Sequence, residues 1–357
     1  MPSKQVLQRG RSVHKNSWKV AQSKARIKRR SKIALGILAI IIGLLILSWV
    51  IRFTHSLFTP WKLSEKHPRN YMWNGELNIN LLVRTSTISL FSYNPKEEKI
   101  EIVDIPDETF LEVPAGFGSW QLRSVYGLGQ TQKDLGGDKL LIDTLTSFFA
   151  LPIDGYLDLS SLPGQKTPTE VIEELRQSPI SGLKFLSVLK TDLTPLELLR
   201  LKFSLSSVRF DKVYKTDLLK LNVLDKESLP DGTEVYRTDP VKLDSALSDL
   251  VDPAIVLEHK TIAVFNATDQ PQLAGKWARL ITNLGGNVII TSNAKARLSK
   301  TQVLGEQSLT LRRLQQVFGN LDCQNNPKCD KISTLKEDLN SSRAQINVFV
   351  GEDFVNR

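Results

Sequence analysis

Residues 77–105, LNINLLVRTSTISLFSYNPKEEKIEIVDI, decide the fold of the first folded part of the chain. Residues 77–83 are a strand-like apolar run. Residues 87–93 alternate apolar with small polar side chains, as half-buried strands do. The turn signal NPKEEK at 94–99 precedes the strand-like run IEIVDI. The stretch therefore predicts three consecutive strands.

Beyond these strands, helical and strand-like patterns alternate. Residues 136–151 carry apolar side chains at helical spacing, and PIDGYLDLS at 152–160 is typical of another strand. Two amphipathic runs, 167–178 and 194–205, begin with Thr caps followed by Pro. Such alternation favours an α/β domain layered around one sheet. We assign residues 76–250 to an α/β/α sandwich.

A second, smaller module is expected over residues 258–357. TIAVFN at 261–266 is a buried-type strand, and Asp269 is expected to cap a helix over residues 270–284. The strand-like run NVIIT follows at 287–291. A second helix over 308–318 and a last strand, INVFVG at 346–351, complete a β-α-β-α-β order.

The formal charge of +9 is concentrated at one end of the chain. Residues 1–32 contain eleven Lys or Arg and no acidic residue, which leaves 36 basic against 38 acidic residues elsewhere. A segment of this composition predicts a disordered basic tail. Nucleic-acid binding is disfavoured because no stacking pattern of aromatic residues accompanies the charges, whereas anionic lipid or control of topology suits them.

Residues 33–51, IALGILAIIIGLLILSWVI, contain no charged residue and predict a transmembrane helix. At 1.5 Å per residue they extend over ~28 Å, close to the thickness of a bilayer core. A cleaved signal peptide is the alternative, but its apolar region is shorter and ends at small residues. The basic flank places the N-terminus in the cytoplasm and the later domains outside. Residues 52–75 are then a juxtamembrane connector.

Cys323 and Cys329, the two cysteines, enclose a short turn-rich loop. In an oxidising compartment they are candidates for a disulfide, and two free thiols are the alternative. A zinc site would need two more ligands, and no histidine lies near them in the sequence.

The ordered motifs resemble the LytR-CpsA-Psr (LCP) family of envelope proteins. Arg84-Thr85-Ser86-Thr87 stands where that family has R-x-D-T, 94–96 is its N-P-K turn, and 105–109 takes the place of I-P-R-D-T. QLRSVYGLG at 121–129 is similar to its K-I-N-A-A-Y-x-x-G run. Residues 263–288 and 346–354 are similar to the LytR-type C-terminal domain often attached to it. The resemblance covers most of 76–165 and 259–354.

The resemblance implies transfer of a glycopolymer from a polyprenyl-pyrophosphate carrier to the cell wall. Such a reaction needs arginines to hold the pyrophosphate and carboxylates to hold Mg²⁺. The motifs are degenerate here, since Ser86 replaces the expected Asp and Asp107 replaces the expected Arg. Arg84, Glu108 and Arg123 remain as candidate catalytic residues, with Glu108 the candidate metal ligand. Solvated strand-end arginines and loop carboxylates are the alternative.

Three functions follow from these features. The first is a membrane-anchored pseudoenzyme of the cell envelope that binds or scaffolds glycopolymer, polyprenyl-phosphate lipid or a partner protein. The second is an active, divergent phosphotransferase that uses Mg²⁺ and arginines from elsewhere in the chain. The third is a regulator acting through the basic tail, which the lack of a folded DNA-binding motif disfavours.

Overall fold

The computed structural model describes residues 14–60, 69, 71–132, 135–177, 184–319 and 332–355. The chain divides into two compact units, residues 1–59 and residues 60–357. Cys323 and Cys329 lie outside the described residues, so their pairing remains a prediction. The domain boundaries expected from the sequence also remain predictions.

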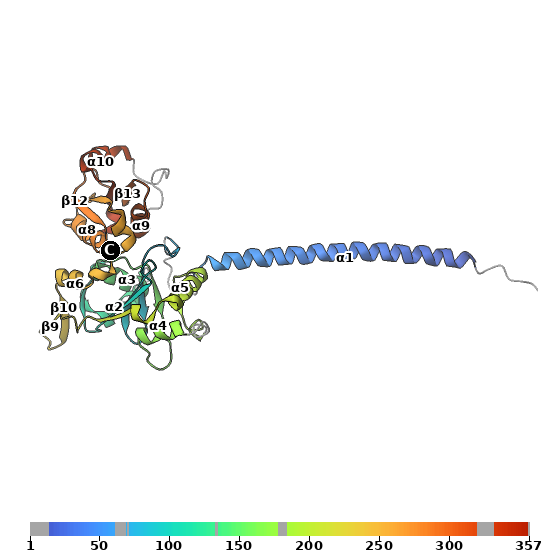
Figure 1. Ribbon diagram of the computed structural model, residues 1–357, viewed down its shortest axis with the longest axis horizontal. Coiled ribbons are helices and arrows are strands. Elements are labelled where there is room, and N and C mark those ends of the chain that lie inside the picture. Colours follow the sequence, from blue (N-terminus) through green and yellow to red (C-terminus); the bar gives the residue numbers. More distant parts are fainter. Residues whose placement is uncertain are drawn as a thin grey trace, which may run out of the picture. The chain divides into compact units, whose positions relative to one another are not determined.

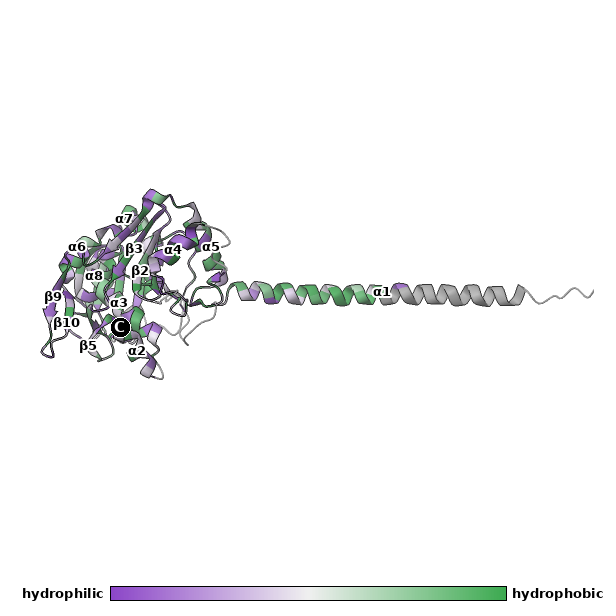
Figure 2. Ribbon diagram, turned by 90° about the horizontal axis from the view of Figure 1, so that it is seen from below, coloured by the Kyte–Doolittle hydropathy of each residue, from purple (hydrophilic) through white to green (hydrophobic). Residues whose placement is uncertain are grey.

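The first unit contains one long helix, α1 (His14–Leu57). Its segment Leu35–Leu57 is long and apolar enough to cross a membrane, by length and composition. Most residues of this part of the helix are hydrophobic (Figure 2), and its large apolar side chains are exposed. The helix differs from the expectation at both ends, because it begins inside the segment predicted to be disordered and continues beyond Ile51 to Leu57.

The second unit contains a mixed six-stranded sheet, as Figure 1 shows in part. Its strands, in spatial order, are β7 (Lys190–Thr191), β6 (Gly155–Asp158), β1 (Ile79–Arg84), β2 (Ile88–Asn94), β3 (Lys99–Ile105) and β8 (Val213–Asp217). Strands β1, β2 and β3 pair antiparallel in succession, while β6 and β8 run parallel to β1 and β3. The three predicted consecutive strands are therefore confirmed.

Alternate residues of the central strands face two separate cores. Leu82, Leu90 and Val103 pack with α2 (Leu122–Thr131), α3 (Gly137–Phe149) and α6 (Pro240–Ala246) on one face. Leu81, Phe91 and Ile102 pack with α4 (Pro168–Gln177) and α5 (Pro195–Ser207) on the other. Since successive side chains of a strand point to opposite faces, this gives the predicted α/β/α sandwich.

Two features of this domain have clear local causes. Thr194 and Glu197 form a capping box at the start of α5, as the Thr-Pro sequence suggests. Two hairpins were not predicted, β4 (Phe110–Val113) with β5 (Gly118–Gln121) and β9 (Leu224–Ser228) with β10 (Glu234–Thr238). All four strands are short, and β5 and β9 are largely exposed, so the hairpins lack a sustained apolar pattern.

The smaller module contains a four-stranded sheet. Its strands, in spatial order, are β12 (Asn287–Asn293), β11 (Thr261–Asn266), β14 (Ile346–Val350) and β13 (Gln302–Gly305). Helices α8 (Leu273–Asn283) and α9 (Leu309–Val317) pack on one face. The short helices η4 (Ile332–Leu335) and α10 (Lys336–Ser342) lie toward the other. α7 (Pro253–Glu258) precedes this sheet. The expected strand and helix order is present, with β13 in addition.

The predicted start of α8 was wrong. The helix begins at Leu273 and its N-cap is Gln272, with a left-handed φ of 62°. Asn266 holds the preceding turn, since its Oδ1 accepts from the Thr268 N–H at 3.0 Å and its Nδ2 donates to the Gln270 carbonyl at 2.7 Å. Asp269 instead pairs with Arg297 at the surface.

Candidate functional site

The motif residues lie at one edge of the six-stranded sheet. Arg84 ends β1 and Ile105 ends β3, and both are in register with Ile88 of the intervening β2. Two strand spacings therefore separate these ends by roughly 10 Å. The residues after β1 and β3, which include Ser86 and Asp107, thus leave the sheet at the same edge. The sheet brings the two motifs into one neighbourhood.

Arg84 is already engaged by two neighbours. Its Nη1 donates to the Asp158 Oδ2 at 3.0 Å, because the two residues are direct partners in the parallel β1–β6 pair. The guanidinium also stacks on the ring of Tyr126, 3.6 Å from its centroid. Asp158 is buried and its other oxygen accepts from the Ser160 N–H at 3.0 Å. A charge-assisted bond to a buried carboxylate competes with any phosphate for Arg84.

Ser86 lines a small cavity of 260 Å³ with Thr85, Ser160 and Lys166. Its hydroxyl donates to the Lys166 carbonyl at 3.1 Å. The hydroxyl of Thr85 is buried and has no hydrogen-bond partner among the described residues. The lining combines polar residues with Leu159 and Leu162, and its only charged residue among those described is Lys166. A carboxylate at position 86 would have added a negative charge here, and Ser86 adds none.

The loop of Asp107 and Glu108 is held by backbone hydrogen bonds. The Arg123 N–H donates to the Asp107 carbonyl at 3.2 Å, and the Tyr236 N–H donates to the Glu108 carbonyl at 3.2 Å. Burial and the charge of Glu108 raise the pKa of the Asp107 carboxyl, and the charge of Arg123 opposes the rise. This part of the site is therefore a negatively charged pair with one arginine beside it.

The resemblance implies Mg²⁺, and the residues at this edge do not fit it. A magnesium site needs several oxygen ligands at one point, with carboxylates among them. Asp158 already accepts hydrogen bonds from Arg84 and Ser160, and the Ser86 hydroxyl donates to a backbone carbonyl. Within the described ranges, no group of three or more His, Cys, Asp and Glu side chains is placed to hold a metal ion.

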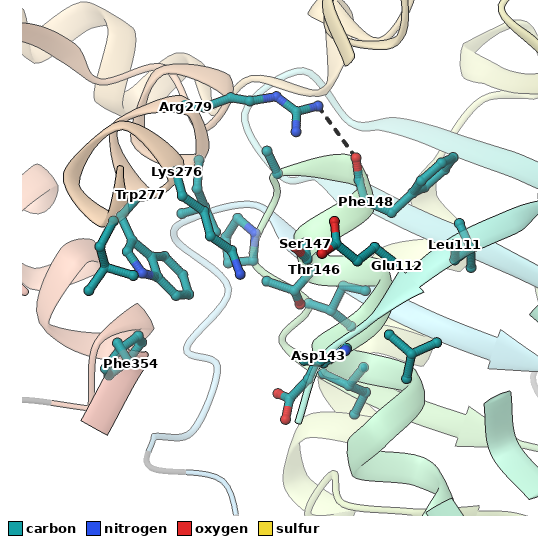
Figure 3. A pocket seen from close by; sticks show the side chains of 18 of the residues that line it. Leu111, Glu112, Asp143, Thr146, Ser147, Phe148, Lys276, Trp277, Arg279 and Phe354 are labelled. Carbon is teal, nitrogen blue, oxygen red and sulfur yellow. Dashed lines mark hydrogen bonds between the residues drawn. The ribbon is translucent and has the colours of Figure 1, made fainter. Parts of the chain in front are cut away.

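Sequence reasoning missed two members of this site and a larger groove. The sequence placed Asp158 in a predicted strand and Tyr126 in a motif, and assigned neither a role at the site. A buried acid usually pairs with a basic residue, which is the pattern that Asp158 and Arg84 show. A cavity of 1380 Å³ lies elsewhere, lined by β4, α3 and α8 (Figure 3). Glu108 does not line it.

The fold and this strand-end site define an α/β protein whose smaller module matches a known family. Residues 260–354 match the family described as LytR cell envelope-related transcriptional attenuator. Over 77 residues the chain is 30% identical to the polyisoprenyl-teichoic acid–peptidoglycan teichoic acid transferase TagU of Halalkalibacterium halodurans, which is 22% of this chain and 23% of that protein. The resemblance to LytR-CpsA-Psr proteins is confirmed by these matches.

Solved structures with a similar course of the chain include B. subtilis TagT, at a TM-score of 0.36 and 14% identity over 55% of this chain and 97% of that one. Another is the LytR-CPS2A-psr family protein YwtF (TagT) with bound octaprenyl pyrophosphate lipid, at a TM-score of 0.36 and 14% identity over 53% and 97%. The matched stretch of TagU, by contrast, spans less than a quarter of that relative.

Proposed function

We propose that this chain is a membrane-anchored protein of the cell envelope that binds envelope glycopolymer without transferring it. Its N-terminal tail lies in the cytoplasm and residues 60–357 lie outside. The matches to a LytR-type family and to a teichoic acid transferase support a role in the envelope. The apolar segment Leu35–Leu57 supports the anchor, and the basic residues before it support the orientation.

One observation carries the proposed loss of transfer. The edge of the sheet where the resemblance expects arginine and aspartate instead combines Asp107 with Glu108, and Arg84 is bound to Asp158. A pyrophosphate brought to this edge would meet two carboxylates and a neutral Ser86. Like charges at contact distance are unfavourable even near a protein surface. The site therefore repels the leaving group that a transferase must stabilise.

A divergent phosphotransferase is the second candidate. Two residues favour it. Arg84 is the arginine expected at its motif position, and Glu108 keeps the negative charge expected at its own. It would also have to draw Arg123 and Lys166 toward the phosphate. Lys166 already pairs with Glu174, with 2.6 Å between its Nζ and the Glu174 Oε2. Because Lys166 is already in an ion pair, this observation favours the binding role.

A transfer assay on the full chain separates the two functions. The chain is placed in lipid nanodiscs with Mg²⁺, a labelled polyprenyl-pyrophosphate-linked glycopolymer and a cell-wall glycan acceptor. We expect no label on the acceptor above the protein-free level, and binding of the lipid-free polymer to the nanodiscs. Transfer that disappears in Glu108→Gln would establish the second candidate. Absence of polymer binding would contradict the first.

A further inference from the structure

A large groove lies where the smaller module meets the larger domain. It is lined by the hairpin strand β4, by α3 and by the first turns of α8, within the single compact unit of residues 60–357. Its 1380 Å³ exceeds the ~300 to 1,000 Å³ typical of small-molecule pockets. The space suits an extended chain better than a single small ligand.

One ion pair and one hydrogen bond hold the walls of this groove together. Arg279 of α8 binds Asp244 of α6 through both oxygens, at 2.7 and 2.6 Å. Asn283 of α8 donates to the Phe149 carbonyl at the end of α3, at 3.2 Å. These contacts join the smaller module to the larger domain directly beside the groove. Its shape is therefore built into the fold and needs no ligand to form.

Donors and acceptors face each other across the groove. Lys276 extends from α8 toward the side occupied by Glu112 and Thr146 (Figure 3). It remains accessible through the groove, yet burial by the surrounding protein lowers the pKa of its amine, against the charges of Glu112 and Asp143. The Glu112 side chain is exposed, and its carboxylate has no hydrogen-bond or ion-pair partner among the described residues. Its two oxygens are available to a ligand.

The lining of the groove also contains aromatic rings and side chains of both charges. The Arg237 guanidinium lies over the Phe110 ring, 4.6 Å from its centroid, and both residues line the groove. The Lys276 Nζ lies 5.6 Å from the centroid of the buried Trp277 ring. Basic lining residues are Arg69, Arg237, Lys276 and Arg279, and acidic ones are Glu112, Asp143 and Asp154. Such a lining gives a polyanion no strong net attraction.

We propose that this groove is a saccharide-binding site for a glycan chain without repeated phosphates, with Glu112 and Lys276 holding its hydroxyl groups. A sugar hydroxyl both donates and accepts hydrogen bonds, as a Ser hydroxyl does. Glu112 accepts from two hydroxyls, and Lys276 donates to others. The inference rests on the proposed binding of envelope glycopolymer and assigns it to a site away from the degenerate motifs.

The test uses the full chain in nanodiscs and a hexasaccharide of N-acetylglucosamine, with binding followed by calorimetry. We expect saturable binding that weakens about tenfold in Glu112→Gln and in Lys276→Met, since each removes hydrogen bonds to a charged group. The exposed pair Lys295 and Glu337 supplies controls, because it lies outside the groove. Lys295→Met and Glu337→Gln should bind as the natural chain does.

Three outcomes would overturn the assignment. They are no binding of the hexasaccharide, binding that both groove variants retain in full, and binding of poly(glycerol phosphate) in preference to the hexasaccharide. Thermal unfolding of each variant shows whether a loss of binding reflects a loss of fold. If the groove variants retain binding, the proposed function stands and only the groove is refuted. Transfer in the assay described above would refute the proposed function and leave hexasaccharide binding to be judged by itself.

Discussion

Arg313 of α9 and Asp154, which precedes β6, form a bidentate ion pair between the smaller module and the larger domain. The N–O distances are 2.8 and 2.9 Å, and the side chains are only 1% and 3% exposed. Tyr71 bonds to both partners, accepting from Arg313 at 2.8 Å and donating to Asp154. Burial acts to lower the pKa of Arg313, but the charges and hydrogen bonds of Asp154 and Tyr71 together outweigh it, and the pKa is raised.

Removing one partner of this pair should destabilise the chain strongly. Arg313→Met leaves Asp154 charged and buried, so we expect a loss of about 3 to 5 kcal/mol in the free energy of unfolding, measured with urea. The double variant Arg313→Met/Asp154→Leu should recover much of this loss. The neighbouring Arg312 provides the control. It pairs with Glu76 at 3.1 Å with both side chains 56% exposed, and Arg312→Met should cost at most about 1 kcal/mol.

Asp192 should give the folded protein an unusual dependence on pH. Burial raises the pKa of its carboxyl to about 6, despite the nearby charge of Arg69 and a bond from the Tyr156 N–H. An acid with a raised folded pKa binds protons more tightly when folded, so its contribution falls as pH rises from about 4 to about 6. Urea titrations should show this loss, relative to Asp192→Asn, and no difference in slope above pH 7. Parallel curves from pH 4 to 7 would contradict the burial argument.

Two glycines of α2 should respond to alanine in opposite directions. A Cβ on Gly129 would lie 2.5 Å from the backbone oxygen of Gly136, so the start of α3 would have to move. A Cβ on Gly127 meets nothing within 4 Å. We expect Gly129→Ala to lower the melting temperature, and Gly127→Ala to raise stability by ~0.5 to 1 kcal/mol through helix propensity. Equal effects would mean that the two helices are not in close contact.

The membrane segment can be tested by limited proteolysis. Sealed right-side-out vesicles bearing the full chain should lose residues beyond Arg52 to an external protease, while the basic tail stays protected. Inside-out vesicles should give the reverse pattern. This follows from the Lys and Arg residues that precede the apolar segment Leu35–Leu57. Release of the whole chain by alkaline carbonate would contradict a transmembrane anchor.

Local patterns were sufficient for much of the fold. The strand-like runs in residues 77–105 and the turn signal at 94–99 predicted β1, β2 and β3. Both signals favour consecutive strands in this stretch. Thr194 before Pro195 marked the start of α5. The helix start at Asp269 was wrong because Asn266 holds the next residues in a turn, which competes with the helix.

Long-range relationships could not be read from the sequence. Arg312 and Arg313 are adjacent and chemically identical, yet one is exposed and the other buried against Asp154. The pairing of Arg84 with Asp158 depends on which strand lies beside β1, and the groove depends on how two modules meet.

Polyprenyl pyrophosphate affinity, with and without Mg²⁺, tests the loss of transfer most directly. The full chain and the variant Ser86→Asp/Asp107→Arg are compared in nanodiscs containing the lipid. We predict weak binding by the natural chain that Mg²⁺ does not strengthen. The variant should bind at least about tenfold more tightly, because the two positive units gained in Asp107→Arg exceed the one negative unit added by Ser86→Asp. Tight, Mg²⁺-dependent binding by the natural chain that Glu108→Gln abolishes would contradict the account.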